Sequence, residues 1–254
     1  MARKLAEKRE PKRVKVEDTD WYQNSPALFM KDTLLKTIKL SLKCKSENQK
    51  KFVNMIREKE ITICAGAPGT GKTFLACHLA IELLKQNSTY EKIVLVKSVT
   101  PLKSEEIGFL KGTLEEKMEP FVFSFMHNFQ KIIGKPNVDK LKQEKIIDVI
   151  PIAYMRGINI DNAIIIIDEV QNITIDNMHT ILTRLGSNSK MIFLGDLNQI
   201  DMKNKKETSL KFLLEKFGDV SEIGVVELSS DDIVRNVLIK KIEKIFSEHE
   251  KSNK

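Results

Sequence analysis

The segment from Gly66 to Thr73 restricts the fold of this chain more than any other, because it reads GAPGTGKT and matches the pattern G-x-x-x-x-G-K-[ST] in full. The apolar run Ile61–Ala65 precedes it, and Thr73–Lys85 follows it with the apolar spacing of a helix. Glycines let backbone N–H groups turn inward without a Cβ clash, and the helix N-terminus adds a partial positive charge. A strand, this loop and a helix in that order predict a phosphate-binding loop within an α/β domain.

The residue types in this loop predict that it binds ATP together with Mg²⁺. We expect the Lys72 ammonium to contact the β- and γ-phosphates, and the Thr73 hydroxyl to coordinate the metal ion. The residues expected to contact the nucleotide are those of the loop and the residue after it: Gly66, Ala67, Pro68, Gly69, Thr70, Gly71, Lys72, Thr73 and Phe74.

Short runs of aliphatic and β-branched residues recur after residue 60, and helical stretches separate most of them. These expected strands are Glu60–Ala65, Lys92–Val96, Ile147–Ile152, Ala163–Ile167, Lys190–Leu194 and Ile223–Leu228. Strands that alternate with helices predict right-handed βαβ units and a doubly wound, mainly parallel sheet flanked by helices. Ligands bind such sheets at the carboxyl ends of the strands.

The expected strand Ala163–Ile167 is followed by two acidic residues, Asp168 and Glu169. Its run of isoleucines is typical of a strand buried on both faces of a parallel sheet. A carboxylate at the end of such a strand is costly unless a cation meets it, so we assign Asp168 as the Walker-B ligand of Mg²⁺. Glu169 lies one residue further, where its carboxylate can polarise the attacking water, and we expect it to act as general base.

The next expected strand, Lys190–Leu194, is followed by the sequence GDLNQ at residues 195–199. We expect Gln199 to lie near the γ-phosphate or the attacking water and to take part in catalysis. The alternative is a polar turn in which Asp196 caps a helix.

A helical insertion interrupts the expected core of residues 59–230 at about residues 102–145. Its apolar stripe comprises Leu110, Leu114, Met118, Phe121, Phe125 and Phe129. The stripe fits a helical cap packed on the core, an oligomer contact or a nucleic-acid gate. Outside the core we expect a charged flexible tail, a helical lead-in and a C-terminal helix, at residues 1–25, 26–58 and 231–254.

The lead-in is expected to form two helices. The spacing of its apolar residues predicts the first over Asp32–Lys43. The second is predicted to begin at Ser46, whose side chain can cap it while Gln49, three residues later, reciprocates.

Composition restricts the partners and the location of the chain. Its 254 residues are enough for one sizeable α/β domain. The formal net charge of +7 favours a polyanionic partner such as nucleic acid, although a lysine-rich surface also serves solubility. No apolar run approaches the roughly 18 residues that span a bilayer, and the charged N-terminus does not resemble a secretory signal. We therefore expect a cytoplasmic protein without a membrane partner.

These motifs together resemble those of superfamily-1 helicase ATPase cores and, more closely, those of the PhoH family of P-loop ATPases. The matching stretches span roughly residues 46 to 240, in this order: ENQKKF, AGAPGTGKT, GFLKG, AYMRG, IIDEVQN, LTRLGSNSK, GDLNQID and DIVRN. After the phosphate loop each is only moderately specific, but the ordered set is highly specific. Val170 departs from the usual alanine, and Lys97-Ser98 replaces the common Arg-Pro.

The resemblance implies ATPase activity, a RecA-like core and action on RNA or single-stranded DNA. It also implies that the Gln49 amide reads the adenine edge, in competition with its capping role or together with it. Arg156 and Arg184 match the family's motifs, and salt-bridge or packing duty is favoured for each. Some relatives carry an N-terminal PIN nuclease domain, which we do not expect here because fewer than fifty residues precede the first matching motif.

A two-lobed helicase closes a second RecA-like domain over ATP and supplies an arginine from it, and we expect no second lobe in this chain. We expect Arg235 to supply that arginine to a neighbouring subunit, where it would neutralise charge developing on the γ-phosphoryl oxygens. A head-to-tail ring, with a hexamer favoured, is the closed homo-oligomer in which every site receives such a finger. An ordinary surface arginine on a terminal helix is the alternative.

The leading hypothesis is an oligomeric, Mg²⁺-dependent ATPase that remodels, unwinds or moves along RNA or single-stranded DNA. Single strands would pass the loops that follow the strands, including Ser98–Thr100, with Lys97 and Lys103 on phosphates. The alternatives are a nucleotide-switched protein-interaction module without motor activity and a small-molecule kinase. The kinase is disfavoured because Glu169 and Gln199 suit the activation of water.

Overall fold

The computed structural model describes residues 26–97, 114–202, 204, 207–234, 238, 241, 242 and 245, with only the backbone described for 26–30 and 114–121. Within these residues, six strands form one parallel sheet in the order β3-β2-β4-β5-β1-β6. The strands are β1 (Ile61–Gly66), β2 (Lys92–Lys97), β3 (Ile147–Val149), β4 (Ala163–Asp168), β5 (Lys190–Gly195) and β6 (Ile223–Leu228).

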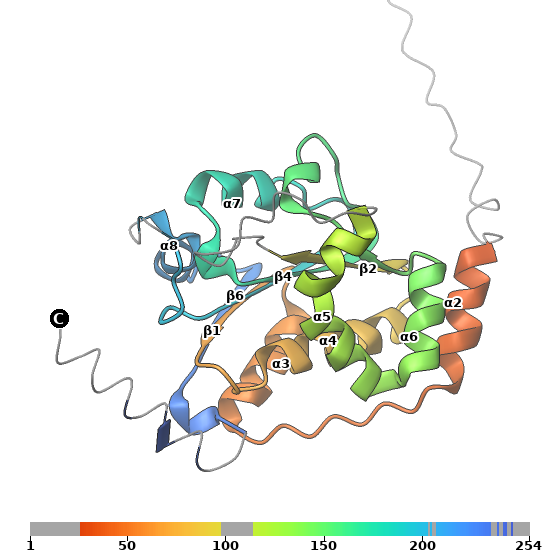
Figure 1. Cartoon of the computed structure of the whole chain (residues 1–254), viewed down its shortest axis with the longest axis horizontal. Helices are drawn as coiled ribbons and strands as arrows, with labels where there is room; N and C mark the ends of the chain where they lie inside the picture. The colour runs from red at the N-terminus through yellow and green to blue at the C-terminus, as the bar shows by residue number, and fades with distance from the viewer. Residues whose placement is uncertain are drawn as a thin grey trace, which may run out of the picture.

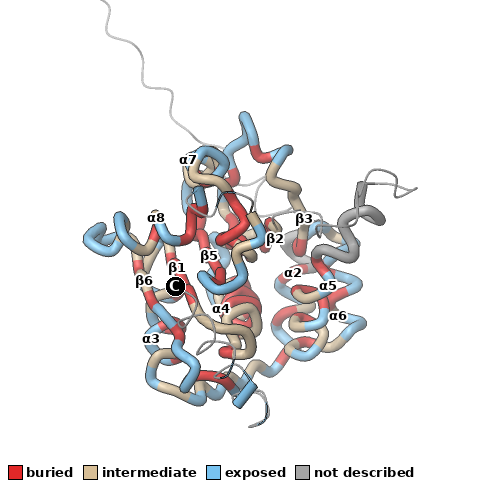
Figure 2. Tube along the Cα trace, turned by 60° about the vertical axis from the view of Figure 1, so that its left-hand side comes forward, coloured by how far each residue is buried: buried red, intermediate tan, exposed pale blue. Residues whose placement is uncertain are grey.

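Helices cover both faces of the sheet (Figure 1). The larger layer contains α2 (Pro26–Thr37), α3 (Glu47–Glu58), α4 (Lys72–Gln86), α5 (Leu114–Ile133) and α6 (Lys135–Gln143). The opposite face is covered by α7 (Ile175–Leu182) and α8 (Ser209–Lys216). Short 3-10 turns lie at Ile152–Tyr154, Val170–Asn172 and Ser230–Asp232. In Figure 2 the central strands are mostly buried, whereas exposed residues gather on loops and on the outer sides of the helices.

Strand β4 shows how the apolar sequence produces this layering. Every residue from Ala163 to Asp168 is buried. Ile164 and Ile166 pack in the core under the larger helical layer, and Ile165 and Ile167 pack in the core under α7 and α8. Because side chains alternate between the faces of a sheet, a strand covered on both faces has to be apolar at every position.

The strand order confirms the expected fold class. β1, which leads into the phosphate loop, is separated from β4, which ends in Asp168, by β5 alone. A parallel sheet with this order and with helices on both faces is the RecA-like arrangement of P-loop proteins. The expected strands are all present, although β3 ends at Val149 rather than at residue 152. Pro151, which has no backbone N–H to donate, follows and leads into a 3-10 turn.

The helix expected over Asp32–Lys43 was placed wrongly, since α2 spans Pro26–Thr37 and residues 38–44 are not helical. In this segment buried or half-buried residues alternate with exposed ones from Ile38 to Cys44. Leu40 and Leu42 pack against the core beneath the larger helical layer. The period of two belongs to extended chain, and the leucines fit that period as well as they fit a helix.

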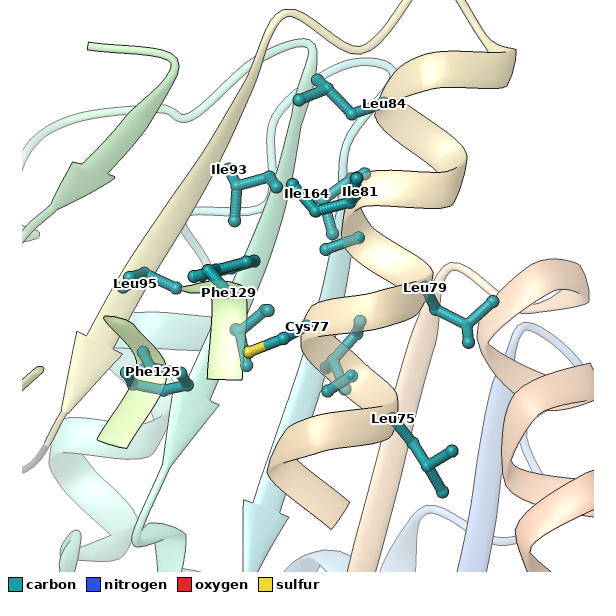
Figure 3. Packing of buried hydrophobic residues seen from close by; sticks show 14 of the residues in the cluster. Leu75, Cys77, Leu79, Ile81, Leu84, Ile93, Leu95, Phe125, Phe129 and Ile164 are labelled. Carbon is teal, nitrogen blue, oxygen red and sulfur yellow. The ribbon is translucent and has the colours of Figure 1, made fainter. Parts of the chain in front are cut away.

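The described part of the helical insertion packs on the core through its phenylalanines. Phe125 and Phe129 of α5 are fully buried, and Figure 3 shows them pointing toward β2 and α4. Of the other residues in the expected apolar stripe, Leu110 lies outside the described residues, and the side chains of the remaining three are not described. No helix of the described residues, α5 included, combines the length and apolarity needed to cross a bilayer.

We predict that Phe129→Ala lowers the free energy of unfolding by about 3–5 kcal/mol, because it leaves a cavity between α5, β2 and α4. The matched control is Phe123→Ala on the same helix, since that ring is 68% exposed and stacks on His127. The control should change the free energy of unfolding by no more than about 0.5 kcal/mol. Urea unfolding measures both, and equal losses would contradict the packing described here.

Candidate nucleotide-binding site

The carboxyl ends of β1, β4 and β5 lie side by side, because neighbouring parallel strands in register end at the same edge of a sheet. A cavity of about 500 Å³ opens at this edge. Most residues expected at the site from sequence line it: Pro68, Gly69, Gly71, Lys72, Thr73, Phe74, Asp168, Glu169 and Gln199. Four others do not belong to this lining: Gln49, Gly66, Ala67 and Thr70.

The phosphate loop takes a backbone path that only glycine follows easily. Gly69 and Gly71 have φ values of +82° and +88°, in the left-handed region. Between them Thr70 is fully buried, and its Oγ1 donates a hydrogen bond to the Ala67 carbonyl at 2.9 Å. The loop therefore closes into a compact turn at the start of α4, as a phosphate cradle requires.

The Lys72 ammonium lies under this turn. Its Nζ donates to the carbonyl oxygen of Ala67 at 3.0 Å and to that of Gly66. Both acceptors are uncharged backbone groups, so the ammonium is ready to pair with an anion that enters the loop. A phosphate would form the stronger, charge-assisted hydrogen bond.

The Asp168 carboxylate is nearly buried, with 7% of its surface exposed. Burial, and then the charge of Glu169, raise its pKa to about 6, against the opposing charges of Lys97 and Lys72. Its Oδ2 lies 3.4 Å from the Thr73 hydroxyl, and its Oδ1 accepts the Glu169 N–H at 3.0 Å. The raised pKa indicates that the surrounding groups do not fully compensate this buried negative charge.

Mg²⁺ fits this position. It prefers oxygen ligands, and the Thr73 hydroxyl and the Asp168 carboxylate place two oxygens 3.4 Å apart at the edge of the cavity. A divalent cation there would supply the positive charge that the buried carboxylate lacks.

Glu169 has a strained backbone, with φ +57° and ψ +40°. For a residue other than glycine this conformation costs on the order of 1–3 kcal/mol, and strained residues of this kind cluster at functional sites. Its carboxylate faces the cavity and is held by two partners. Oε2 accepts a hydrogen bond from Gln171 Nε2 at 2.7 Å, and Oε1 lies 3.8 Å from Lys97 Nζ.

Gln171 is a site residue that sequence reasoning missed. It is fully buried, and its amide joins the ends of two strands. Nε2 donates to Glu169 and to the Gln199 carbonyl at 3.2 Å, and Oε1 accepts the Asp196 N–H at 3.0 Å. Its place in the DEVQ motif was visible, but its two partners after β5, Asp196 and Gln199, lie 25 and 28 residues along the chain and could not be read from the sequence.

The turn after β5 places Gln199 at the cavity. Asp196 Oδ1 accepts the Asn198 N–H at 2.9 Å, and the Gln199 N–H bonds the Asp196 carbonyl at 3.2 Å. Residues 196–202 contain no helix, so Asp196 stabilises a turn and does not cap a helix. Gln199 lines the same cavity as the phosphate loop.

Gln49 supports the loop from behind. Ser46 caps α3 as expected, because its side chain accepts the Gln49 N–H at 3.2 Å. The Gln49 side chain does not reciprocate on Ser46, however: Oε1 accepts the Lys45 N–H at 2.6 Å, and Nε2 donates to the Thr70 carbonyl at 2.8 Å. Both ends of the amide are engaged and the residue is buried. Contact with adenine stays a prediction.

The insertion contributes three residues that sequence reasoning did not assign to the site. Ser124, Asn128 and Lys131 of α5 line the nucleotide cavity. Their spacing puts them on one side of the helix, next to the buried face that carries Phe125 and Phe129. The apolar stripe was readable from the sequence. The packing of α5 decides which of its polar residues face the phosphate loop, and the sequence does not give that packing.

Several expected residues have other outcomes. Arg235, like Ser98–Thr100 and Lys103, lies outside the described residues.

Val234, just before Arg235 in sequence, lines the cavity and donates its N–H to the Gly69 carbonyl at 3.1 Å. Arg184 hydrogen-bonds the carbonyls of Thr180 and Ile158, both at 3.2 Å. Arg156 is exposed and lines a second cavity.

A parallel sheet of RecA-like order, a glycine-rich loop with its lysine, and an acidic residue at the end of a buried neighbouring strand define a P-loop nucleotide-binding protein. A family model described as PhoH-like protein matches residues 41–247. The chain therefore belongs to the PhoH-like family.

Relatives with that description occur in several bacteria. The chain is 36% identical over 202 residues to a PhoH-like protein of Bacillus subtilis, a match that covers 80% of this chain and 63% of the relative. It is 33% identical over 237 residues to a PhoH-like protein of Synechocystis, covering 93% and 71%. Among solved structures, the large terminase from a thermophilic bacteriophage aligns with a TM-score of 0.45 at 13% identity, covering 78% of this chain and 49% of that one. That likeness is too low to bear on function.

We predict that, without divalent metal at pH 7.5, Asp168→Asn is more stable than the parent by on the order of 2–3 kcal/mol, because the pKa raised to about 6 penalises the charged carboxylate in the folded state. This destabilisation by the charged carboxylate is fully present above the pKa of the folded state. It is lost as pH falls from that pKa toward the pKa of the unfolded state. The difference between the two proteins should therefore shrink between pH 7.5 and pH 5.

The matched control for this comparison is Asp148→Asn on β3. Its Oδ1 also accepts the N–H of the next residue, at 2.8 Å, but the residue is only half-buried. The control should show no comparable gain in thermal or urea unfolding. A parent protein in EDTA that is more stable than Asp168→Asn at pH 7.5 would contradict the account of this carboxylate.

Proposed function

We propose that this chain is a Mg²⁺-dependent ATPase whose turnover is coupled to binding RNA or single-stranded DNA. The observation that carries the ATPase proposal is the convergence of Lys72, the pair Thr73–Asp168, and Glu169 on one cavity of about 500 Å³. One group binds phosphate, the second suits a divalent cation, and the third is a carboxylate that can accept a proton.

In the proposed reaction, the loop and the Lys72 ammonium hold the triphosphate in place. Water forms a bond to the γ-phosphorus while the bond to the β–γ bridging oxygen breaks, and Glu169 accepts the proton that the water loses. The products are ADP and phosphate. When bound, Mg²⁺ would neutralise charge on the phosphate oxygens, with Thr73 and Asp168 as its protein ligands.

Two further residues complete the proposed catalytic set. Gln199, which lines the same cavity as the loop, orients the attacking water or senses the γ-phosphate. Arg235 of a neighbouring subunit neutralises charge in the transition state, which requires a homo-oligomeric ring, with a hexamer favoured. The support for this is positional, because the residue before Arg235 lines the cavity.

Coupling to nucleic acid is supported by charge and by position. The chain carries a formal net charge of +7. Lys97 lies at the carboxyl edge of the sheet, where it contacts the proposed general base. A strand bound along this edge would lie next to the groups that hydrolyse ATP.

An ATPase assay tests the proposal. Glu169→Gln should lower turnover by about 10²–10⁴-fold, the usual contribution of a general base, while binding of Mg·ATP is retained. The matched control is Glu215→Gln on α8, an exposed residue that pairs with Lys211 on the helix surface. The control should hydrolyse ATP at the parent rate.

Single-stranded RNA or DNA should raise turnover of the parent, and the gain should disappear at high salt because phosphate contacts release counterions. No hydrolysis by the parent, or full hydrolysis by Glu169→Gln, would contradict the ATPase proposal. Turnover that is unchanged by any strand would favour a nucleotide-switched module instead.

A further inference from the structure

A second cavity lies next to the nucleotide cavity at the carboxyl edge of the sheet. Its volume is about 620 Å³, and its walls come from the segments after β3 and β4 and from α7. Lys97, the last residue of β2, lines both cavities. The two cavities therefore share one cation, through which a ligand in one can act on the other.

The lining of the second cavity suits an anion. Its charged residues are Lys97 and Arg156, both cationic, and no carboxylate of the described residues belongs to the lining. Asn177 of α7 adds a neutral hydrogen-bonding side chain. The carboxylate of Asp201, which contacts the lining residue Asn172, accepts a hydrogen bond from that residue's Nδ2 at 3.3 Å. A phosphate group would meet two cations and an amide here.

Lys97 also restrains the proposed general base. Its Nζ lies 3.8 Å from Glu169 Oε1, and Gln171 Nε2 donates to Glu169 Oε2 at 2.7 Å. Protein groups thus engage both oxygens of the carboxylate. A carboxylate whose Oε1 is drawn toward Lys97 is oriented by that ion pair and not by the attacking water, and geometry is the first requirement for a general base.

We infer that the second cavity binds a phosphate group of a single nucleic-acid strand through Lys97 and Arg156, and that this binding draws the Lys97 ammonium away from Glu169. An ion pair of 3.8 Å with a partly exposed carboxylate is weak, so a phosphodiester can displace it. The freed carboxylate then takes its place beside the attacking water. This inference rests on the proposed ATPase function and explains how a strand would stimulate it.

A strand fits the cavity better than a free phosphate ion because of the neighbouring surface. Tyr154, on the same loop as the lining residues Ala153 and Arg156, is 61% exposed. An exposed aromatic ring beside a phosphate site offers a base a stacking surface, and stacking works for any base. Stacking next to a phosphate contact is how proteins bind single strands without sequence preference.

Turnover of full-length variants tests the restraint. Lys97→Gln should raise basal ATP turnover several-fold, and a single-stranded oligouridylate or oligothymidylate should then stimulate it little further. Lys97→Arg, which keeps the cation, should retain low basal turnover and stimulation. The control Lys211→Gln, an exposed lysine on α8 outside both cavities, should behave as the parent does.

Strand binding is measured separately by fluorescence anisotropy with a labelled oligouridylate, in the absence of turnover. Arg156→Gln should weaken binding by about fivefold at 0.15 M salt, as expected from the loss of one phosphate contact, and should reduce the salt dependence accordingly. Lys97→Gln should weaken binding by a similar factor. Inorganic phosphate at millimolar concentration should neither stimulate turnover nor displace the strand.

The outcomes separate this inference from the ATPase proposal. If the parent hydrolyses ATP and Glu169→Gln does not, while Lys97→Gln has parental basal turnover and parental stimulation, the restraint is wrong and the ATPase stands. Parental strand affinity in both Lys97→Gln and Arg156→Gln would place the strand elsewhere. Stimulation by inorganic phosphate alone would make the ligand a free anion. A parent without ATPase activity would overturn both proposals.

Discussion

The Asp168 carboxylate, buried at the end of a strand with no other polar residue, is the constraint on which the rest of the site depends. Burial raises its pKa to about 6, so the fold carries this negative charge at a cost unless cations surround it. Lys72 and Lys97 supply part of that compensation. The Thr73 hydroxyl lies 3.4 Å from this carboxylate, and the two oxygens together suit a divalent cation. The phosphate loop lies at the same edge of the sheet, and a nucleotide bound there would place its phosphate groups next to this cation.

The sheet makes this arrangement by register. Because β1, β5 and β4 are parallel and adjacent, the phosphate loop, the turn with Gln199 and the acidic end of β4 meet at one edge. The buried amide of Gln171 then links the turn with Gln199 to the acidic end of β4. Gly195 leaves room at this junction, since a Cβ there would lie 2.7 Å from Leu210 Cδ2 and 2.9 Å from Gln171 Oε1 and would require both side chains to shift.

Sequence reasoning predicted the parts of this structure whose signals are local. The glycine-rich loop carries its own geometry, and the isoleucines of β4 are typical of a strand covered on both faces. The first helix of the lead-in was misplaced because its leucines satisfy two periods, and only packing decides that Leu40 and Leu42 belong to extended chain. The amide of Gln49 illustrates a different limit, since its bond to the Thr70 carbonyl joins residues 21 positions apart.

Contacts between distant segments were out of reach for the same reason. That Ser124, Asn128 and Lys131 line the nucleotide cavity depends on the rotation of α5 about its buried phenylalanines. That Lys97 lines two cavities depends on where β3 and α7 lie relative to β2. The residue types at these positions are ordinary for a lysine-rich chain, and only the fold gives them a position from which they can act.

The central claim is that Lys72 and the Thr73–Asp168 pair together bind Mg·ATP. Calorimetric titration with ATP tests it most directly. We predict that the parent protein binds ATP, and that binding weakens by at least about tenfold when EDTA removes Mg²⁺ and by at least about tenfold in Lys72→Ala. Each change removes a charged contact to phosphate. Equal affinity for ATP in the parent and in Lys72→Ala, with and without Mg²⁺, would contradict it.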